Sequence, residues 1–182
     1  MTTFTASDTL SPAIVPAFAD TDQTGRTLAI ICSKGSLDMA YPGLILANAA
    51  LGEGVETMLF FTFWGFDMIT KSRMDDLQFS PVGNAAMHLP GGDMHFPQSV
   101  APLPGMTAMA THLLKKQIAD LGVPEVPEFL DQIVAAGGHL WACRMSADMN
   151  KLTETDLRED VEAIISAADF IEKTEGAQLL FI

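Results

Sequence analysis

The fold of this chain follows from one stretch near its beginning, Thr27-Leu28-Ala29-Ile30-Ile31-Cys32-Ser33-Lys34-Gly35-Ser36. The apolar run up to Cys32 has the length and composition of a buried strand, and the polar residues after it form a turn. Apolar side chains then recur at helical spacing until Gly52, at Ala40, Leu44, Ala47 and Leu51. The pattern predicts a strand, a turn and a helix. Pro42 lies inside that helix unless the helix begins near Tyr41.

A second apolar run, from Val55 to Thr62, completes a β-α-β unit. A strand that is apolar along its whole length is buried on both faces, and this requires helices on both sides of the sheet. Strands and helices continue to alternate toward the end of the chain. We therefore predict a three-layer α/β/α fold with a mainly parallel central sheet of about five strands and a flavodoxin-like topology.

The other elements follow from the same patterns. We expect a short helical piece over 63–74, helices over 106–121 and 128–136, a strand that ends at Cys143, short helical turns over 146–150 and 153–160, a longer helix over 164–174, and a final strand over 178–182. Residues 1–26 lack periodicity, which predicts a flexible amino-terminal arm before a single domain over 27–182.

Composition narrows the classes of function. With 48% apolar residues, the 182-residue chain can bury one substantial core. Its 23 acidic and 10 basic residues give a formal charge of −13, which argues against a nucleic-acid partner. The longest apolar stretch, 58–66, is about half of a membrane-spanning helix. We expect no membrane association, no cofactor and a cytoplasmic location, where the two cysteines stay reduced.

The candidate reactive residue is Cys143, in the stretch Gly137-Gly138-His139-Leu140-Trp141-Ala142-Cys143-Arg144-Met145-Ser146. The strand delivers this thiol to its carboxyl end, where open α/β sheets bind their ligands. A buried cysteine that packs as a small hydrophobe is the alternative. Cys32 ends a strand of the same kind, so it is either a core residue or a secondary thiol that pairs with Cys143 if their strands are neighbours.

Two groups of polar residues are candidate anion ligands. The loop of Ser33, Lys34, Gly35 and Ser36 precedes a helix and offers amides, hydroxyls and an ammonium group to an oxyanion. A simple turn in which Ser36 caps the helix explains the same residues. Arg144 and the amides at Ser146 are the groups expected to favour the thiolate form of Cys143.

The long connection over 79–105 contains histidines and methionines. His88, Asp93 and His95 are weak candidates for a metal site, because imidazole and carboxylate groups bind zinc and thioethers bind copper. Their spacing matches no standard motif. A lid whose methionines cover the thiol pocket is the interpretation we favour, because methionine packs adaptably on apolar surfaces.

Three stretches resemble the DsrE/DsrF-like sulfur-relay family, in the branch often called peroxiredoxin-like. They are residues 33–42, Phe60-Phe61-Thr62-Phe63-Trp64-Gly65-Phe66, and Ala142-Cys143-Arg144-Met145-Ser146. The resemblance implies a DsrE-like α/β domain in which the residue at Cys143 holds sulfane sulfur as a persulfide or a thiosulfonate. It also implies transfer to a small sulfur-carrier or rhodanese-like partner protein, and a homo-oligomer that is a trimer or a multiple of one. An additional cysteine that some relatives carry in the middle region is absent here.

Three functions remain open from the sequence. The first is a sulfur carrier, or sulfurtransferase-like protein, that exchanges small sulfur anions at Cys143. The second is a peroxiredoxin-like thiol oxidoreductase, which requires a resolving thiol. The third is a non-catalytic oligomeric or metal-binding module, which does not depend on Cys143.

Overall fold

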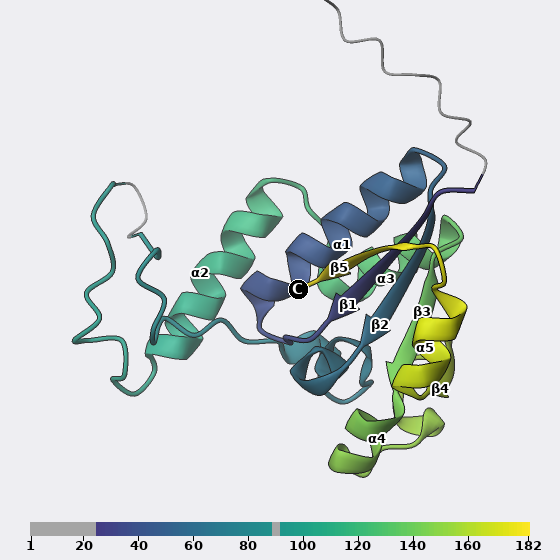
Figure 1. Ribbon diagram of the computed structural model, residues 1–182. Helices are drawn as coiled ribbons and strands as arrows, with labels where there is room; N and C mark the ends of the chain where they lie inside the picture. Colours follow the sequence, from purple (N-terminus) through teal and green to yellow (C-terminus); the bar gives the residue numbers. More distant parts are fainter. Residues whose placement is uncertain (1–24, 89–91) are drawn as a thin grey trace, which may run out of the picture.

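A five-stranded parallel sheet forms the centre of the computed structural model, which describes residues 25–88 and 92–182 (Figure 1). The strands are β1 (Thr27–Cys32), β2 (Glu56–Phe61), β3 (His139–Cys143), β4 (Val161–Ile165) and β5 (Gln178–Phe181). All four pairings between neighbouring strands are parallel. The predicted α/β class with a parallel sheet is confirmed. The expected arm lies outside the described residues except for Gly25 and Arg26.

Strand order explains which helices cover which face. The order β4-β3-β2-β1-β5 moves outward from β1 in one direction and returns to the other side of β1 for the last strand. Right-handed crossovers therefore place the helices that follow β1 and β2 on one face and the helix that precedes β5 on the other. This order differs from the 2-1-3-4-5 order of flavodoxin itself, because the last strand pairs with β1.

The helices follow this rule. They are α1 (Leu37–Gly52), α2 (Met106–Asp120), α3 (Val126–Ala135), α4 (Arg144–Asn150) and α5 (Ala167–Lys173), with 3₁₀ turns η1 (Phe63–Ile69), η2 (Met74–Asp76) and η3 (Glu154–Asp156). Figure 1 shows α1 and α3 on one face of the sheet, α5 on the other, and α4 beyond the carboxyl ends of the strands. None of the described helices is long and apolar enough to cross a bilayer.

The core divides into two clusters on opposite faces of the sheet. The larger cluster lies under α1 and α3 and contains Ile30, Cys32, Leu59 and Leu140. The smaller cluster lies under α5 and contains Ala29, Met58, Phe60, Trp141, Cys143 and Phe170. Side chains alternate along each strand, so β1, β2 and β3 each contribute to both clusters.

The structure changes one predicted boundary, at β4, and settles another, at the start of α1. β4 replaces the start of the helix expected over 164–174, which is limited to α5. Ser166 ends the strand and begins the helix, because its hydroxyl accepts the amide of Asp169 and the Asp169 carboxylate accepts the amide of Ser166. Helix α1 begins at Leu37, so of the two alternatives left open by the sequence Pro42 lies inside the helix.

Two glycines allow the loops at the carboxyl edge to pack backbone against backbone. A Cβ atom on Gly35 would lie 2.0 Å from the carbonyl oxygen of Trp64, and one on Gly65 would lie 2.1 Å from the carbonyl oxygen of Cys32. Neither approach is compatible with a side chain. The amide of Thr62 also donates to the carbonyl of Cys32 at 3.0 Å. The loops after β1 and β2 are therefore one packed unit beside the end of β3.

Candidate thiol site at the carboxyl edge of the sheet

Cys143 is the last residue of β3 and the residue that precedes the first turn of α4. Its backbone is extended, with φ −76° and ψ 123°, which is the conformation of a helix N-cap. In this position the backbone amides of Met145 and Ser146 favour the thiolate form, although the side chain makes no capping hydrogen bond. The predicted location at the end of a parallel strand thus places the thiol against the free amides of a helix.

Hydrogen bonding makes this thiol easier to ionise than an ordinary cysteine. Burial alone raises the pKa of Cys143 because it penalises the charged form. Hydrogen bonds from the side chain of Thr62, from the backbone and side chain of Ser146 and from the backbone of Met145 outweigh that effect and lower the pKa. The thiolate is the reactive form of cysteine, so these four contacts increase the reactive fraction at neutral pH.

Ser146 connects the thiol to the loop after β2. Its hydroxyl oxygen accepts the backbone N–H of Phe63 at 2.7 Å and lies 3.3 Å from the hydroxyl oxygen of Thr62. Because Phe63 supplies the proton for that bond, the hydroxyl hydrogen of Ser146 is free to point at sulfur. Phe63 has a φ of 47°, in the left-handed region that a bulky residue rarely adopts. This strained backbone conformation of Phe63 directs its N–H toward the hydroxyl oxygen of Ser146.

A second set of bonds holds α4 in place behind Ser146. The side-chain amide of Asn150 donates to the carbonyl of Ser146 at 2.9 Å. Arg73 donates to the side-chain oxygen of Asn150 at 3.2 Å and to the carboxylate of Asp67 at 2.7 Å. These contacts tie the short helix to η1, and they fix the position of the groups that bind the thiol.

The thiol remains reachable from solvent. Cys143 is 5% exposed and lines a surface pocket of about 360 Å³, together with Arg144, Met145, Asp148, Ser166 and Ala167. Met145 is 58% exposed at the pocket. A small sulfur compound or the flexible end of a partner can therefore reach the sulfur atom without unfolding of the sheet.

The predicted anion ligands divide into those near the thiol and those elsewhere. Ser146 contacts the thiol, as described above. Arg144 lines the same pocket, but its guanidinium donates to the carbonyl of Ile164 at 2.6 Å. The loop of Ser33, Lys34, Gly35 and Ser36 does not line this pocket: Gly35 lines a different one, with Asp67, Arg73 and Asp76 among its other residues.

The other members of that loop have their own structural roles. Both the amide and the hydroxyl of Ser33 donate to the carbonyl of Ile182, at 2.7 and 2.8 Å. Ser36 begins α1 without a capping bond from its side chain. Lys34 is exposed. The loop therefore joins β1 to α1 and to the carboxyl terminus.

Cys32 does not lie beside Cys143, so the condition for a pairing of the two thiols, that their strands are neighbours, is not met. β2 separates their strands, and two spacings between strands amount to about 9.6 Å. The two side chains also belong to the clusters on opposite faces of the sheet. Burial raises the pKa of Cys32 to about 12, and a Cβ atom on Gly43 of α1 would lie 3.4 Å from its sulfur. Cys32 is a core residue.

The metal candidates do not form a complete ligand set. No group of three or more His, Cys, Asp or Glu residues is arranged to hold a metal within 25–88 and 92–182. His88 and His95 nevertheless face each other across an antiparallel bridge, with ring centroids 4.4 Å apart. Asp93 does not join them in such a group.

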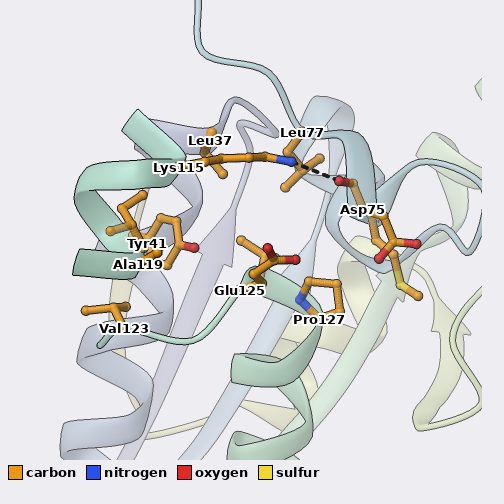
Figure 2. Close-up of a pocket in the computed structure, with 12 residues that line it drawn as sticks. Leu37, Tyr41, Asp75, Leu77, Lys115, Ala119, Val123, Glu125 and Pro127 are labelled. Carbon is orange, nitrogen blue, oxygen red and sulfur yellow. Dashed lines mark hydrogen bonds between the residues drawn. The ribbon is translucent and has the colours of Figure 1, made fainter. Parts of the chain in front are cut away.

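A separate cavity of about 40 Å³ lies between α1, η2, α2 and α3 (Figure 2). Its wall is mainly apolar and includes Leu37, Tyr41, Leu77 and Val123, and Lys115 donates to the carbonyl of Asp75 at its rim. A cavity of this size holds a water molecule or two. The cavity lies on the face of the sheet where Cys32 packs, and Cys143 is not among its lining residues.

Thr62, Phe63 and Asn150 are site residues that sequence reasoning missed. Thr62 ends the strand predicted from Val55 and Phe63 begins the helical piece predicted over 63–74, and neither residue type suggests contact with a thiol. The four-residue spacing of Ser146 and Asn150 on a helix is the one available signal, because residues at i and i+4 share a helix face. The contact of α4 with the residues that follow β2 depends on strand order, which no local sequence pattern encodes.

Comparison with known proteins identifies relatives over most of the chain. The model of the DsrE/DsrF/DrsH-like family matches residues 24–182. Sulfur carrier protein DsrE2 of Allochromatium vinosum is 36% identical over 158 residues, which cover 86% of this chain and 98% of the relative. The uncharacterized protein YrkE of Bacillus subtilis is 28% identical over 166 residues, which cover 89% of this chain and 99% of that protein.

A solved structure shares the fold at low sequence identity. The protein of unknown function MTH1491 from Methanobacterium thermoautotrophicum superimposes with a TM-score of 0.51 at 9% identity, over 86% of this chain and 99% of that chain.

Proposed function

This chain belongs to the DsrE/DsrF/DrsH-like family, and we propose that it is a sulfur carrier that holds sulfane sulfur on Cys143 and passes it to a partner protein. The observation that carries this proposal is the position of Cys143, which ends β3 at the first turn of α4 and lines a surface pocket; its polar neighbours lower the pKa of the thiol. A relative named as a sulfur carrier over nearly its whole length supports the same role.

The transfer needs no redox partner. The thiolate of Cys143 attacks the terminal sulfur of a donor persulfide, R–S–SH, and a new S–S bond forms as the bond within the donor breaks. The products are Cys143–S–SH and the thiolate R–S⁻, so charge and electrons balance. An acceptor thiolate then attacks the terminal sulfur of Cys143–S–SH, takes the sulfur as R′–S–SH and regenerates the Cys143 thiolate.

The pocket favours a persulfide over a thiosulfonate as the carried form. A sulfonate group needs several cationic or amide donors, but one N–H of the Arg144 guanidinium is used by the carbonyl of Ile164 and the amides of Met145 and Ser146 favour the thiolate itself. The carboxylate of Asp148 lines the same pocket and repels an anion. A terminal sulfur atom is smaller and fits a pocket whose other members include the side chains of Met145 and Ala167.

A peroxiredoxin-like cycle has weaker support. Such a cycle needs a second thiol to resolve the oxidised cysteine, and Cys32 is the other cysteine of the chain. Cys32 is buried on the opposite face of the sheet. We therefore expect peroxide to oxidise Cys143 without formation of an intramolecular disulfide.

Partners follow from the same chemistry. The acceptor is a thiol protein, of the small sulfur-carrier or rhodanese-like kind, and the formal charge of −13 favours a basic docking face on it. We expect the protein to self-associate, as a trimer or a multiple of one, and to work in the cytoplasm.

Intact-protein mass spectrometry tests the proposal. After incubation with polysulfide and removal of the excess, the wild type gains the mass of one sulfur atom and Cys143→Ser gains none. Cys32→Ala is the matched control and still gains one sulfur. Tetrathionate, which delivers a thiosulfonate, loads a smaller fraction of the protein than polysulfide does.

Two results would contradict the proposal. One is a wild-type mass that polysulfide leaves unchanged. The other is a Cys143→Ser variant that gains sulfur as the wild type does. Preferential loading by tetrathionate would leave the carrier role intact and overturn the preference for a persulfide.

A further inference from the structure

His88 and His95 form a cross-strand pair in the connection between η2 and α2. The amide of Phe96 donates to the carbonyl of Met87 at 2.7 Å, and the antiparallel bridge joins His88 to His95. A hydrogen bond between the residues that flank a pair marks it as the non-hydrogen-bonded type, in which the two Cα atoms and side chains approach most closely. The backbone thus brings the two imidazole rings together.

The neighbours of the pair fix the direction in which the rings point. Phe96 is 4% exposed, and Met87 packs against the larger core cluster. Side chains alternate along an extended segment, so the imidazoles of His88 and His95 lie on the opposite side from those anchors, and both residues are exposed. The side chain of Gln98 joins the two arms through Gly83 and Asn84, at 3.0 and 3.1 Å.

We propose that His88 and His95 together bind one divalent transition-metal ion, Zn²⁺ or Cu²⁺, through one ring nitrogen each. Neutral imidazole is a preferred ligand of both ions. Two nitrogens that bind one ion at 2.0–2.1 Å lie at most about 4.2 Å apart. Rings whose centroids are 4.4 Å apart and tilted by 37° reach that separation by rotation of exposed side chains.

The site has open coordination positions. Two protein ligands leave at least two positions to water, because the described residues hold no third His, Cys, Asp or Glu in place. Structural zinc sites have four protein ligands, so this site is exchangeable and does not hold the fold together. The formal charge of −13 raises the local concentration of cations.

Calorimetric titration with Zn²⁺ alone, and with Cu²⁺ alone, tests the site in a Cys143→Ser background that removes the reactive thiol. We expect one ion per chain, with Cu²⁺ bound more tightly than Zn²⁺. His88→Ala and His95→Ala should each weaken binding by at least about tenfold, the loss that even an outer-shell partner can cause. His112→Ala is the matched control, because His112 is an exposed histidine on α2, and it should bind as the background does.

A second measurement places the ion. In NMR spectra, substoichiometric Cu²⁺ should broaden the ring resonances of His88 and His95 before those of His112 and His139. Uniform broadening of the four histidines, unchanged binding in His88→Ala, or no stoichiometric binding in the background protein would overturn the proposal. Sulfur loading of Cys143 is measured separately in the wild type, so either proposal can fail while the other stands.

Discussion

At the scale of single residues, the hydroxyl of Ser146 links the loop after β2 to the thiol, and it lowers the pKa of Cys143 together with Thr62 and the amides of Met145 and Ser146. Ser146 accepts the amide of Phe63 and is thereby free to donate its own hydrogen to the sulfur of Cys143. An alanine at this position removes that donor and leaves the amide of Phe63 without its acceptor. The thiolate then loses one of the contacts that offset its burial.

We expect Ser146→Ala to raise the pKa of Cys143. The direction follows because hydrogen bonds to the charged form lower the pKa of a thiol, so their loss raises it. The measurement is the rate of alkylation by iodoacetamide as a function of pH. In the wild type the half-maximal rate falls below the ordinary cysteine pKa of about 8.5, and in the variant it moves to higher pH.

The matched control is Ser36→Ala, because Ser36 makes no capping bond through its side chain. Its pH profile should coincide with that of the wild type. Equal profiles for Ser146→Ala and the wild type would show that the serine hydroxyl does not stabilise the thiolate.

The two cysteines should differ sharply in reactivity. Cys32 is buried and its pKa is raised to about 12, whereas Cys143 has a lowered pKa and lines a pocket. We expect a thiol reagent at pH 7 to label one site in the folded protein, and peptide mapping to assign it to Cys143. Labelling of both cysteines should require denaturant. Fast labelling of Cys32 under native conditions would contradict its place in the core.

At the scale of elements, two glycines determine how the loops after β1 and β2 meet. We expect Gly35→Ala and Gly65→Ala each to lower the free energy of unfolding by about 1–3 kcal/mol or more, the cost typical of overpacking. The added Cβ meets a backbone oxygen in each case, and backbone cannot move as a flexible side chain does. Urea denaturation followed by circular dichroism measures the effect.

Gly52→Ala serves as the control for those variants. Gly52 ends α1, and a Cβ atom there meets nothing within 4 Å. The change should leave the stability unchanged or raise it by up to about 1 kcal/mol, because alanine favours the helix and restricts the unfolded chain. Equal stability of all three variants would contradict the tight packing of the two loops.

Most elements could be predicted because their apolar residues follow one clear period. β1, β2 and the strand that delivers Cys143 are apolar runs of strand length, and α1 repeats its apolar residues at helical spacing. β4 was missed because Ile164 and Ile165 also fit the apolar spacing of the helix that follows. The capping pair of Ser166 and Asp169 is the signal that separates strand from helix here.

At the scale of the whole molecule, strand order decided which predictions about the site failed. Both cysteines end parallel strands and lie at the same edge of the sheet, as expected from their sequence positions. Their separation depends on β2 lying between them and on the face to which each side chain points. The reactive thiol could be predicted because its own segment shows that it ends a strand before a helix. Its neighbour Thr62 could not be predicted, because pairing between distant strands leaves no local pattern in the sequence.

The edge strand β5 leaves apolar side chains uncovered. Leu179 and Phe181 are 50% and 70% exposed, and among residues 25–88 and 92–182 β5 pairs with β1 alone. Uncharged edge strands with exposed apolar residues favour association. We expect sedimentation velocity to show an oligomer for the wild type and a shift toward the monomer for Phe181→Glu.

The control for this variant is Leu121→Glu, because Leu121 is 79% exposed and follows α2 instead of lying on the edge strand. It should sediment as the wild type does. A wild type that sediments as a monomer at all concentrations would contradict the expected self-association.

The placement of Cys32 and Cys143 on opposite faces of the sheet also bears on how long a load can be kept. A persulfide is discharged as hydrogen sulfide when a neighbouring thiol closes a disulfide onto it. With β2 between the two strands, that leak has no route within one subunit. The lifetime of the persulfide on Cys143 then depends on encounters with thiols of other molecules. Such a protein releases its sulfur when it meets an acceptor and not spontaneously.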